Sequence, residues 1–532
     1  MAEHAYDYVI VGGGSAGCVV AHRLSARPDV TVLLLEAGGR DSSPLIHMPA
    51  GIARLVDNPH IDWRYYTEPE AELQGRRLYW PRGRVLGGSS SINAMCYTRG
   101  HRLDYDAWAR LGNDGWDYAD VLRYFRKSED QARGASEYHG AGGPLHVEDL
   151  KFRNPLSAVF VEAGVSLGLT RNEDFNGPRQ EGVGFYQVTQ RNGRRCSSAV
   201  AYLRRAQGRR RLRILTRSLV TRVRFERDRA IGVEYRRAGQ LHAVRAEREV
   251  IIAAGAVASP QLLMLSGLGP ADQLRSHGIA VVADRAEVGA NLQDHLDFCT
   301  LVRCTQPITY DFTMAQEIAV SLRYLFSGSG PGVSNVAEAG GFLRTALAPD
   351  ERPDVQLHFV PAQLDDHGRN RLPGHGYTLH ACVLRPRSRG QILLRSNRPE
   401  DAPLIRPRYL TAPPDLDVLL EGVRLAREIL NAAPFNPYRG EELFPGAGAM
   451  TRPALAAVVR RKAETIYHPV GTCRMGSDPN AVVDTRLRVR GVRGLRVVDA
   501  SIMPELIGGN TNAPVIMIAE KAAEWIAADS GH

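Results

Sequence analysis

The chain lacks the features that would mark a membrane-spanning or disulfide-stapled protein. No apolar run approaches the roughly 18 residues that a spanning helix needs. The seven cysteines are scattered, odd in number and without a Cys-x-x-Cys motif, so we expect neither a disulfide framework nor a zinc or other metal site. The first predicted strand begins at Asp7, which leaves no room for a signal peptide. We therefore expect a protein of the reducing cytoplasm.

Lysine is also scarce, with only four residues among 67 basic ones, although the net charge is +9. The densest basic cluster consists of six arginines between positions 204 and 213: Arg204, Arg205, Arg209, Arg210, Arg211 and Arg213. Such a cluster can attract anionic lipid or nucleic acid, or can be a solvated surface. Because no nucleic-acid recognition module accompanies it, we expect no nucleic-acid partner. Peripheral contact with the inner membrane face stays open.

What the chain does have is a nucleotide-binding fingerprint at its N-terminus. A short apolar strand, Asp7–Val11, runs into the G-x-G-x-x-G loop of Gly12, Gly14 and Gly17. A helix-compatible stretch and a second apolar strand follow, and Glu36 ends that strand about 20 residues past the loop. Glycines permit the tight turn and a close approach of backbone to a pyrophosphate, while the acid accepts hydrogen bonds from a ribose. The pattern predicts a βαβ dinucleotide site but does not distinguish NAD from FAD.

At 532 residues the chain exceeds the usual size of one domain. Apolar strands alternate with helical patterns in the first third, and Leu495–Val498 is a late strand of the same type that ends in Asp499. Between them, Val355–Phe359 and Tyr377–Ala381 alternate like antiparallel strands, and helical patterns follow. We predict an α/β nucleotide-binding domain of residues 1–155, 196–306 and 461–532, with an inserted substrate domain of residues 156–195 and 307–460.

Six motifs, in order along nearly the whole chain, resemble the glucose–methanol–choline (GMC) oxidoreductase family. They are Gly12–Gly17 with Glu36, Pro81–Met95, Gly255–Leu263, Gly289–His295, His468–Gly476 and Asn510–Pro514. Within the family the chain is most similar to bacterial FAD-dependent primary alcohol dehydrogenases and choline dehydrogenase-like proteins. The resemblance implies a Rossmann-like FAD-binding domain with an inserted α+β substrate domain built on an antiparallel sheet.

The resemblance implies FAD as the cofactor and assigns residues to it. The expected cofactor-binding residues are Gly12, Gly14, Ser15, Ala16, Gly17, Glu36, Ala37, Gly87, Gly88, Ser89, Asn93, Ala94, Met95, Val220, Asp499, Ala500 and Pro514. From its place at a strand end alone, Asp499 is equally well read as a helix cap. Some family members attach FAD through a histidine that aligns with Ile92, and isoleucine cannot form that bond. We therefore expect a non-covalent, dissociable flavin.

The family match also implies the chemistry. It assigns to His468 the role of general base that takes the alcohol proton while hydride passes to flavin N5. It assigns to Asn512 a hydrogen bond to the same oxygen, and asparagine cannot titrate. Glu338 and His358 match positions that line the substrate pocket in choline-oxidising relatives. No aromatic cluster flanks Glu338 beyond Phe342, and quaternary ammonium groups favour aromatic walls. We therefore favour neutral primary alcohols, aliphatic or aromatic, over choline.

Three alternatives remain at this level. Oxidases that use oxygen share every motif with dehydrogenases that use a quinone or another acceptor, so the electron acceptor stays open. Some family members are lyases without net redox turnover, which an intact pair of His468 and Asn512 disfavours. A pure NAD-dependent dehydrogenase leaves the C-terminal motifs without a role. The oligomeric state and the function of the arginine cluster are not predicted.

Overall fold

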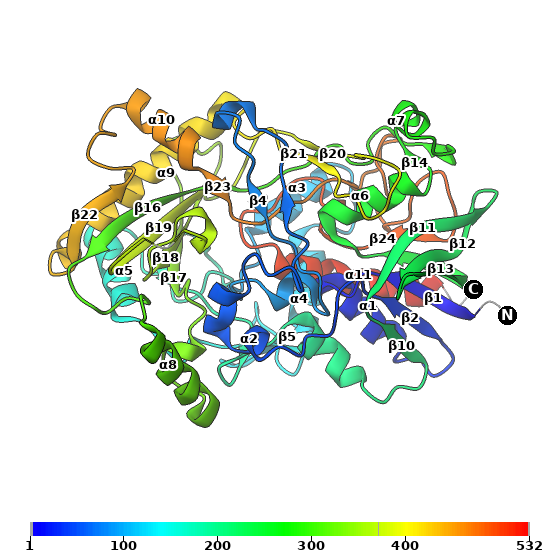
Figure 1. The fold of residues 1–532 in the computed structure, drawn as a ribbon, viewed down its shortest axis with the longest axis horizontal. Helices are drawn as coiled ribbons and strands as arrows, with labels where there is room; N and C mark the ends of the chain where they lie inside the picture. The colour runs from blue at the N-terminus through cyan, green and yellow to red at the C-terminus, as the bar shows by residue number, and fades with distance from the viewer. Residues whose placement is uncertain (1–3, 371, 530–532) are drawn as a thin grey trace.

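The computed structural model describes residues 4–370 and 372–529, arranged around two large sheets that lie side by side (Figure 1). The first sheet is centred on β1 (Ala5–Val11), which pairs in parallel with β2 (Val32–Leu35) and with β13 (Gln240–Ile252). The four apolar residues of β2 are all buried, as expected for a parallel strand covered on both faces. The sheet therefore sets the end of β1, where the glycine loop begins, inside the molecule.

Strand β13 changes partners along its length. Its first half pairs antiparallel with β12 (Arg229–Arg237), and its second half pairs in parallel with β1 and with β24 (Leu495–Val497). The remaining strands of this sheet are β10 (Leu212–Leu215) beside β2 and β11 (Ser218–Glu226) beside β12. The late strand predicted before Asp499 is thus a true member of the first sheet, and it returns the chain to the cofactor side.

The second sheet is antiparallel and has the order β22–β16–β19–β18–β17–β7, with β23 paired to β16. Its strands are β7 (Gly182–Phe185), β16 (Leu296–Cys304), β17 (Ala339–Leu343), β18 (Val355–Val360), β19 (Gly376–Val383), β22 (Arg439–Phe444) and β23 (Glu464–Thr465). Helices α5 (Pro155–Ser166) and α9 (Pro413–Asn431) close an apolar core against it through residues such as Phe160 and Ala426. The predicted fold class, an α/β cofactor domain with an antiparallel substrate domain, is confirmed.

The sheets do not follow the predicted domain ranges at two points. Strand β16 lies within the range 196–306 and β23 within 461–532, yet both belong to the second sheet. The reason is that β16 enters the second sheet directly after the motif Gly289–His295, so the crossing between the sheets occurs at this motif. The chain passes from one sheet to the other again at residues 464–468. These two crossings bring His295 and His468 into contact beside the cavity described below.

Helices α1 (Ser15–Leu24) and α11 (Asn512–Asp529) pack against each other next to the first sheet. Helix α8 (Met314–Ser327) projects from the molecule at the lower left of Figure 1, on the side of the second sheet. The other helical segments are α2 (Pro44–His47), η1 (Pro49–Arg54), η2 (Ala71–Leu73), η3 (Gly88–Ser91), α3 (Arg102–Arg110), α4 (Tyr118–Ser128), η4 (Ala199–Leu203), η5 (Arg204–Ala206), α6 (Gly255–Leu265), α7 (Ala271–Ser276), η6 (Pro331–Val333), η7 (Asp366–Gly368), η8 (Ala433–Phe435), α10 (Arg452–Lys462) and η9 (Ala500–Ile502).

Short strand pairs complete the fold: β3 (Tyr65–Tyr66) with β4 (Tyr79–Trp80), β5 (Glu129–Gln131) with β6 (Leu145–Val147), β8 (Gln190–Arg191) with β9 (Arg194–Arg195), β14 (Leu268–Gly269) with β15 (Ala283–Asp284), and β20 (Gln391–Leu393) with β21 (Leu404–Arg406). All seven cysteines are free, in agreement with their spacing. Among the helices of the described ranges, none combines the length and the apolar character that crossing a membrane requires.

Candidate active site

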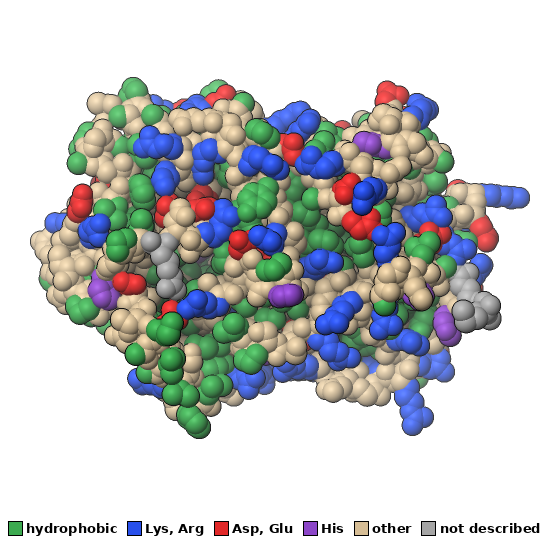
Figure 2. All heavy atoms as spheres, in the orientation of Figure 1, with side chains coloured by type: hydrophobic (Ala, Val, Ile, Leu, Met, Phe, Trp, Pro, Cys, Tyr) green, Lys and Arg blue, Asp and Glu red, His purple; other side chains and the backbone are tan. Residues whose placement is uncertain are grey.

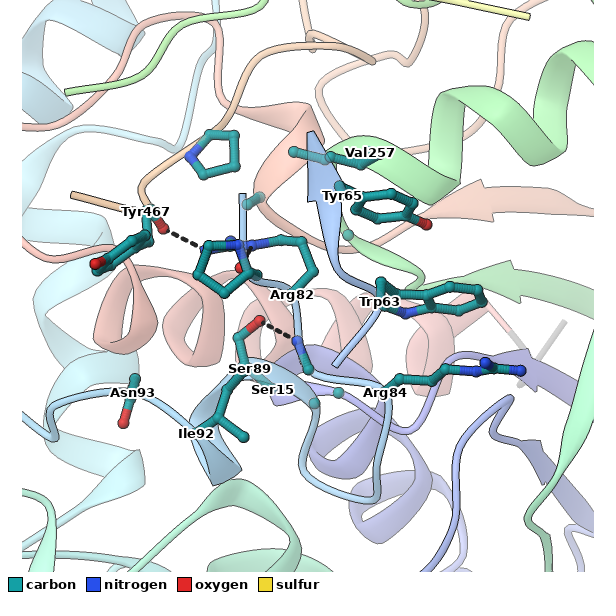
Figure 3. Close-up of a pocket in the computed structure, with 18 of the residues that line it drawn as sticks. Ser15, Trp63, Tyr65, Arg82, Arg84, Ser89, Ile92, Asn93, Val257 and Tyr467 are labelled. Carbon is teal, nitrogen blue, oxygen red and sulfur yellow. Dashed lines mark hydrogen bonds between the residues drawn. The ribbon is translucent and has the colours of Figure 1, made fainter. Parts of the chain in front are cut away.

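A cavity of about 670 Å³ connects the two sheets. It begins at the C-terminal end of β1 with Gly12 and Gly14, and it extends to His468 and Asn510 on the side of the second sheet. Figure 3 shows part of its lining, including Trp63, Arg82 and Tyr467. The two ends of this cavity are built differently, and each is described in turn.

Backbone packing shapes the first end. A Cβ on Gly12 would lie 2.5 Å from the carbonyl oxygen of Ala253, and the φ of Gly12 is +100°, in the region that favours glycine. The second glycine loop, which precedes η3, lies directly on the first, because a Cβ on Gly88 would come within 2.7 Å of Gly14 Cα. The amide of Gly87 donates a 2.7 Å hydrogen bond to the carbonyl of Gly13. Two loops without side chains thus form a smooth cradle at the N-terminus of α1.

Glu36 stands at the end of β2 and is almost fully buried. Its two carboxylate oxygens accept hydrogen bonds from the amides of Gly13 at 2.8 Å and Gly38 at 2.7 Å. Burial raises the pKa of Glu36 to about 7, against the lowering effect of these amides and of Arg84. The carboxylate is therefore held rigidly at the cavity wall, where the fingerprint predicted it.

Asp499 both lines the cavity and anchors backbone. One carboxylate oxygen accepts from Gly255 N at 2.9 Å and from Ser259 Oγ at 2.5 Å, at the start of α6. The other oxygen accepts from Ser501 N at 2.8 Å and caps η9. The two interpretations that its sequence position allowed, cavity residue and cap, are therefore both realised in one side chain.

Most of the residues that the sequence assigned to the cofactor line this cavity. They are Gly12, Gly14, Ser15, Ala16, Glu36, Ala37, Gly88, Ser89, Asn93, Ala94, Met95, Val220, Asp499 and Ala500. Gly17, Gly87 and Pro514 do not line it. Gly17 instead permits helix packing, since a Cβ there would lie 1.9 Å from the carbonyl oxygen of Gly12. Pro514 is buried within the first turn of α11.

The opposite end of the cavity is organised around His468. Its Nδ1 lies 3.0 Å from Nδ1 of His295, and its Nε2 lies 3.2 Å from Nδ2 of Asn510. His295 is itself fixed, because its Nε2 lies 3.1 Å from the carbonyl oxygen of Leu384. Burial lowers the pKa of His468 well below its ordinary value, and the neighbouring His295, His358 and Arg82 lower it further. The imidazole is therefore neutral near pH 7.

The predicted pairing of His468 with Asn512 is wrong, because Asn510 occupies that place. The side-chain oxygen of Asn510 accepts from Gln356 Nε2 at 3.0 Å and from Thr98 Oγ1 at 3.1 Å, which directs its amide nitrogen toward His468. Asn512 is the first residue of α11, and its side-chain oxygen accepts from Ser15 Oγ at 2.8 Å. It still lines the cavity, but at the glycine-loop end. The two asparagines lie two positions apart at a helix start, which turns their side chains in different directions.

The predicted pocket residue Glu338 does not face the cavity. Its carboxylate is fully buried and accepts from Asn154 N at 2.7 Å, Ser157 Oγ at 2.8 Å and Ser334 Oγ at 2.6 Å, and also from Tyr310 Oη. Asn154 and Ser157 stand at the start of α5, so Glu338, which directly precedes β17, ties the helix to the second sheet. Its carboxylate has no oxygen left for a substrate.

His358 does lie in the cavity, where its ring stacks on Tyr186 with 5.2 Å between centroids. Burial lowers the pKa of His358 to about 3, so it is neutral under ordinary conditions. Its Nδ1 is buried and has no protein partner.

Sequence reasoning missed two acidic groups in the cavity wall. Asp297 on β16 forms a 2.6 Å ion pair with His380 on β19, and the Asp297 carboxylate contributes to raising the pKa of His380 against burial. Glu464 stands opposite Asp297 in the strand register, and burial raises the pKa of Glu464 to about 7. Only the register of the second sheet brings these residues together, so no local sequence pattern could reveal them.

Two triads in this wall, Asp297–Cys299–His380 and Asp366–His367–Glu464, place their ligand atoms within 4.8 Å of one another. In the first triad Asp297 pairs with His380, and Cys299 Sγ lies 3.3 Å from His380 Nδ1. In the second, His367 N donates to Glu464 at 3.1 Å and His367 Nδ1 lies 3.5 Å from the same carboxylate. The absence of a metal site stays a prediction.

One wall near His468 is entirely apolar. Its side chains belong to a single packed cluster and all line the cavity: Ala94, Cys96, Val336, Ala337, Val360, Leu364 and Ile466. The reacting end of the cavity thus combines His468, the amide of Asn510 and this apolar surface with the polar groups Asp297, His358 and Glu464 described above.

The residues present fit FAD. The cradle of Gly14 and Gly88 leaves no side chain in the path of a pyrophosphate, and the N-terminus of α1 points its free amides to the same place. Glu36 stands at the ribose position of the fingerprint, and a continuous cavity leads from there to His468.

Comparisons with known proteins agree with this geometry. A family model described as GMC oxidoreductase matches residues 6–297 with its N-terminal part and residues 386–519 with its C-terminal part. The alcohol dehydrogenase (acceptor) of Pseudomonas putida is 51% identical over 98% of this chain and 95% of its own length. The mitochondrial choline dehydrogenase of Homo sapiens is 48% identical over 98% of this chain and 89% of its own.

Solved structures show the same fold. Pyridoxine 4-oxidase from Mesorbium loti superposes with a TM-score of 0.89 at 35% identity, covering 98% of this chain and 99% of that one. A formate oxidase of Aspergillus oryzae RIB40 superposes with a TM-score of 0.94 at 28% identity over the whole of both chains.

Proposed function

Because this chain belongs to the GMC oxidoreductases, FAD-binding enzymes that act on CH–OH groups, we propose that it oxidises neutral primary alcohols to aldehydes and passes the electrons to a quinone or a similar acceptor. The observation that carries the proposal is the arrangement of His468 between His295 and Asn510 beside an apolar wall. The steps below derive how these residues act.

The hydrogen bonds determine which nitrogen of His468 is basic. A carbonyl oxygen only accepts, so His295 Nε2 must carry the hydrogen that it shares with Leu384 O. Burial lowers the pKa of His295 to about 3, so the ring is neutral and its Nδ1 carries no hydrogen. His468 Nδ1 must therefore donate to His295 Nδ1. In neutral His468 the lone pair then lies on Nε2, which accepts a hydrogen bond from Asn510 Nδ2 at 3.2 Å and faces the cavity.

His468 Nε2 and Asn510 Nδ2 both interact with the alcohol oxygen of the substrate. The amide of Asn510 donates a hydrogen bond to the alcohol oxygen, while His468 Nε2 accepts the hydroxyl proton as negative charge develops there. Thr98 and Gln356 hold the amide oxygen, so the donor is oriented before the substrate arrives. When bound, FAD supplies the acceptor for the hydride of the alcohol carbon. The proton stays on His468 until the aldehyde leaves.

The apolar wall supports a neutral substrate over a cation. Of the two acids in this part of the wall, Asp297 is already paired with His380 at 2.6 Å. Burial raises the pKa of the other, Glu464, to about 7, which disfavours its charged form. Glu338 is closed off from the cavity. Seven apolar side chains remain to hold the rest of the substrate. The relatives include an alcohol dehydrogenase as well as choline dehydrogenases, so choline is the second candidate.

A series of straight-chain alcohols tests the substrate class. Burying one methylene against the apolar wall contributes about 0.8 kcal/mol, so kcat/KM should rise about fourfold for each added carbon from ethanol until the pocket is full. We would measure the rates with a soluble artificial electron acceptor, which removes the natural acceptor from the test. A kcat/KM for choline above that of every neutral alcohol in the series would replace this proposal by the second candidate.

The same preparation identifies the acceptor class. Enzyme reduced by substrate without oxygen should be reoxidised slowly by air and rapidly by a quinone. Fast reoxidation by air with production of hydrogen peroxide would make the protein an oxidase instead. Bleaching of the flavin by substrate in the first step would also exclude a lyase without redox turnover.

We further propose that the flavin is bound without a covalent link. Ile92, which aligns with the attachment histidine of some relatives, lines the cavity, and its hydrocarbon side chain cannot form such a bond. Acid precipitation should release all of the yellow colour into the supernatant. Colour that stays with the pellet would contradict the proposal.

A further inference from the structure

Helix α8 presents its apolar side to the outside of the molecule. Met314, Ile318, Leu322, Leu325 and Phe326 are exposed by 80%, 55%, 48%, 68% and 88%, and none of the helix's residues is buried. These positions recur at helical spacing, so they form one stripe. The large exposed stripe is unusual because apolar side chains of this size normally lie inside.

The inner side of α8 is the more polar one. The half-buried residues are Glu317, Val320, Ser321 and Tyr324. Glu317 forms an ion pair with Arg54 of η1, and Tyr324 Oη donates to the carbonyl oxygen of His47 at 3.1 Å. Polar contacts thus hold the helix on the protein while its apolar stripe points away. The helix is therefore held on the protein surface with its apolar stripe exposed, and it is not a core helix.

Basic side chains surround the foot of α8. Arg323 on the helix and Arg194 on β9 are exposed, and the charge of Arg194 lowers the pKa of Tyr324 against the effect of burial. Arg54 and Arg204 have side chains exposed by 55% and 52%. Arg204 lies 3.3 Å from Nε2 of His47, the residue that Tyr324 contacts. Figure 2 shows the hydrophobic projection with basic side chains on both sides.

The acids of this region balance part of that charge. Glu317 pairs with Arg54, and Asp41 lies 3.7 Å from Arg204. Asp311, in the connection before the helix, is also exposed. Among the residues that the structure describes, no ion pair joins Arg194 or Arg323 to an acid, so these two arginines keep their charge beside α8. Arg209 of the arginine cluster points elsewhere, because it donates to Ser25 Oγ at 3.1 Å.

We propose that α8 docks the protein on the surface of an anionic lipid bilayer, with its apolar stripe among the acyl chains and the arginines at the headgroups. An apolar stripe with cations at its borders matches the interface of such a bilayer in both hydrophobicity and charge. A second copy of the chain fits less well, because a symmetric pairing of two α8 helices brings like charges, those of Arg194 and Arg323, toward their own copies.

The docked orientation places the cavity wall close to the lipid. Segment η1 holds α8 through Arg54, and its Ile52 and Ala53, together with the following Leu55, line the cavity. Apolar alcohols and quinones concentrate in lipid. An alcohol or a quinone could therefore reach the cavity from the bilayer through this wall. The docking itself does not depend on the proposed substrate, since it rests on the surface alone.

Sedimentation of the intact flavoprotein with vesicles tests the proposal. Wild type should sediment with vesicles of phosphatidylcholine and phosphatidylglycerol, and much less with pure phosphatidylcholine or at high salt. The double variant Leu325→Glu/Phe326→Glu should reduce vesicle binding at least tenfold. Rates with a soluble electron acceptor should stay unchanged in this variant, which shows that fold and flavin are intact.

A matched control carries the same charge change at similarly exposed apolar positions. The double variant Leu241→Glu/Met450→Glu alters side chains exposed by 60% and 76% away from α8, and it should bind vesicles like wild type. Equal loss in the control, or full binding by the α8 variant, would overturn the proposal. So would a dimer in solution that the α8 variant dissociates, since the stripe would then belong to a second copy. Alcohol oxidation with the soluble acceptor is measured apart from vesicle binding. If the proposed function is wrong, the oxidation rate is absent while vesicle binding is unaffected.

Discussion

The two ends of the cavity are made of different parts of the chain. Backbone forms the glycine-loop end, where Gly14 and Gly88 abut and amides hold Glu36. Side chains form the other end, where His468 and Asn510 meet residues from β16, β18 and β19. The first end should therefore be sensitive to added atoms, and the second to removed ones. The following experiments sharpen this comparison, from the largest expected effect to the smallest.

Removing the base should have the largest effect. His468→Ala takes away the acceptor of the hydroxyl proton, so kcat should fall by about 10²–10⁴ while the flavin spectrum is retained. His60→Ala, at an exposed histidine, serves as the control and should be silent. Stopped-flow reduction of the flavin by substrate measures the step directly. A reduction rate within tenfold of wild type would remove His468 from this role.

Substitution of Asn510 and substitution of Asn512 should have clearly different effects on kcat. Asn510→Ala removes the donor beside His468, and loss of such a donor lowers kcat by about 10²-fold. Asn512→Ala removes only a hydrogen bond with Ser15, worth about 1 kcal/mol, so it should lower the unfolding temperature slightly and leave kcat nearly unchanged. Steady-state kinetics of both variants provide the test. The opposite order of effects would restore Asn512 as the partner of His468.

An added methyl group at the glycine end should affect the cofactor more than the chemistry. In Gly88→Ala the new Cβ would lie 2.7 Å from Gly14 Cα, at a φ of +54°. Overpacking of this kind costs about 1–3 kcal/mol and should weaken FAD binding by about 5- to 150-fold. Gly39→Ala is the matched control, because its Cβ meets nothing within 4 Å. Titration of the apoprotein with FAD gives the affinities, and equal affinity in both variants would mean that the two loops do not form the binding surface.

The pH dependence should be the mildest effect. His468 must be neutral to accept a proton, and its surroundings lower its pKa below the ordinary value of 6.5. The active form is thus fully present above pH 6.5, and kcat/KM should stay constant from pH 8 down to about 6.5 and decline only below. A half-maximal point at or above pH 6.5 would show that the base is not held in this buried environment.

The sequence predicted the glycine-loop end well because its signals are local. A strand, a glycine loop and an acid within the first 36 residues specify both position and contact, and Gly12, Gly14 and Glu36 lie where expected. The substrate end depends on which way a side chain points. Asn510 and Asn512 differ only by their place relative to the start of α11, and a family motif read two residues out of register exchanges them.

Glu338 illustrates a second limit. It was predicted as a pocket residue, but it lies just before β17 and its carboxylate faces the start of α5. The acids at the substrate end of the cavity, Asp297 and Glu464, become neighbours only through the pairing of β16 with β23. Long-range strand register carries no signature in a single sequence, so these residues emerge only from the fold.

The packing of α1 against α11 has a consequence for how the protein is made. Ser15 and Asn512 lie 497 positions apart in the chain, and the Arg23–Glu520 ion pair joins the same two helices. At a synthesis rate of about 5–20 residues per second, α1 leaves the ribosome roughly 25–100 s before α11. Through that interval the nascent nucleotide-binding unit carries an apolar helix without its partner. Completion of the cofactor site therefore waits for the synthesis of α11, and a chain cut short anywhere before α11 cannot close it.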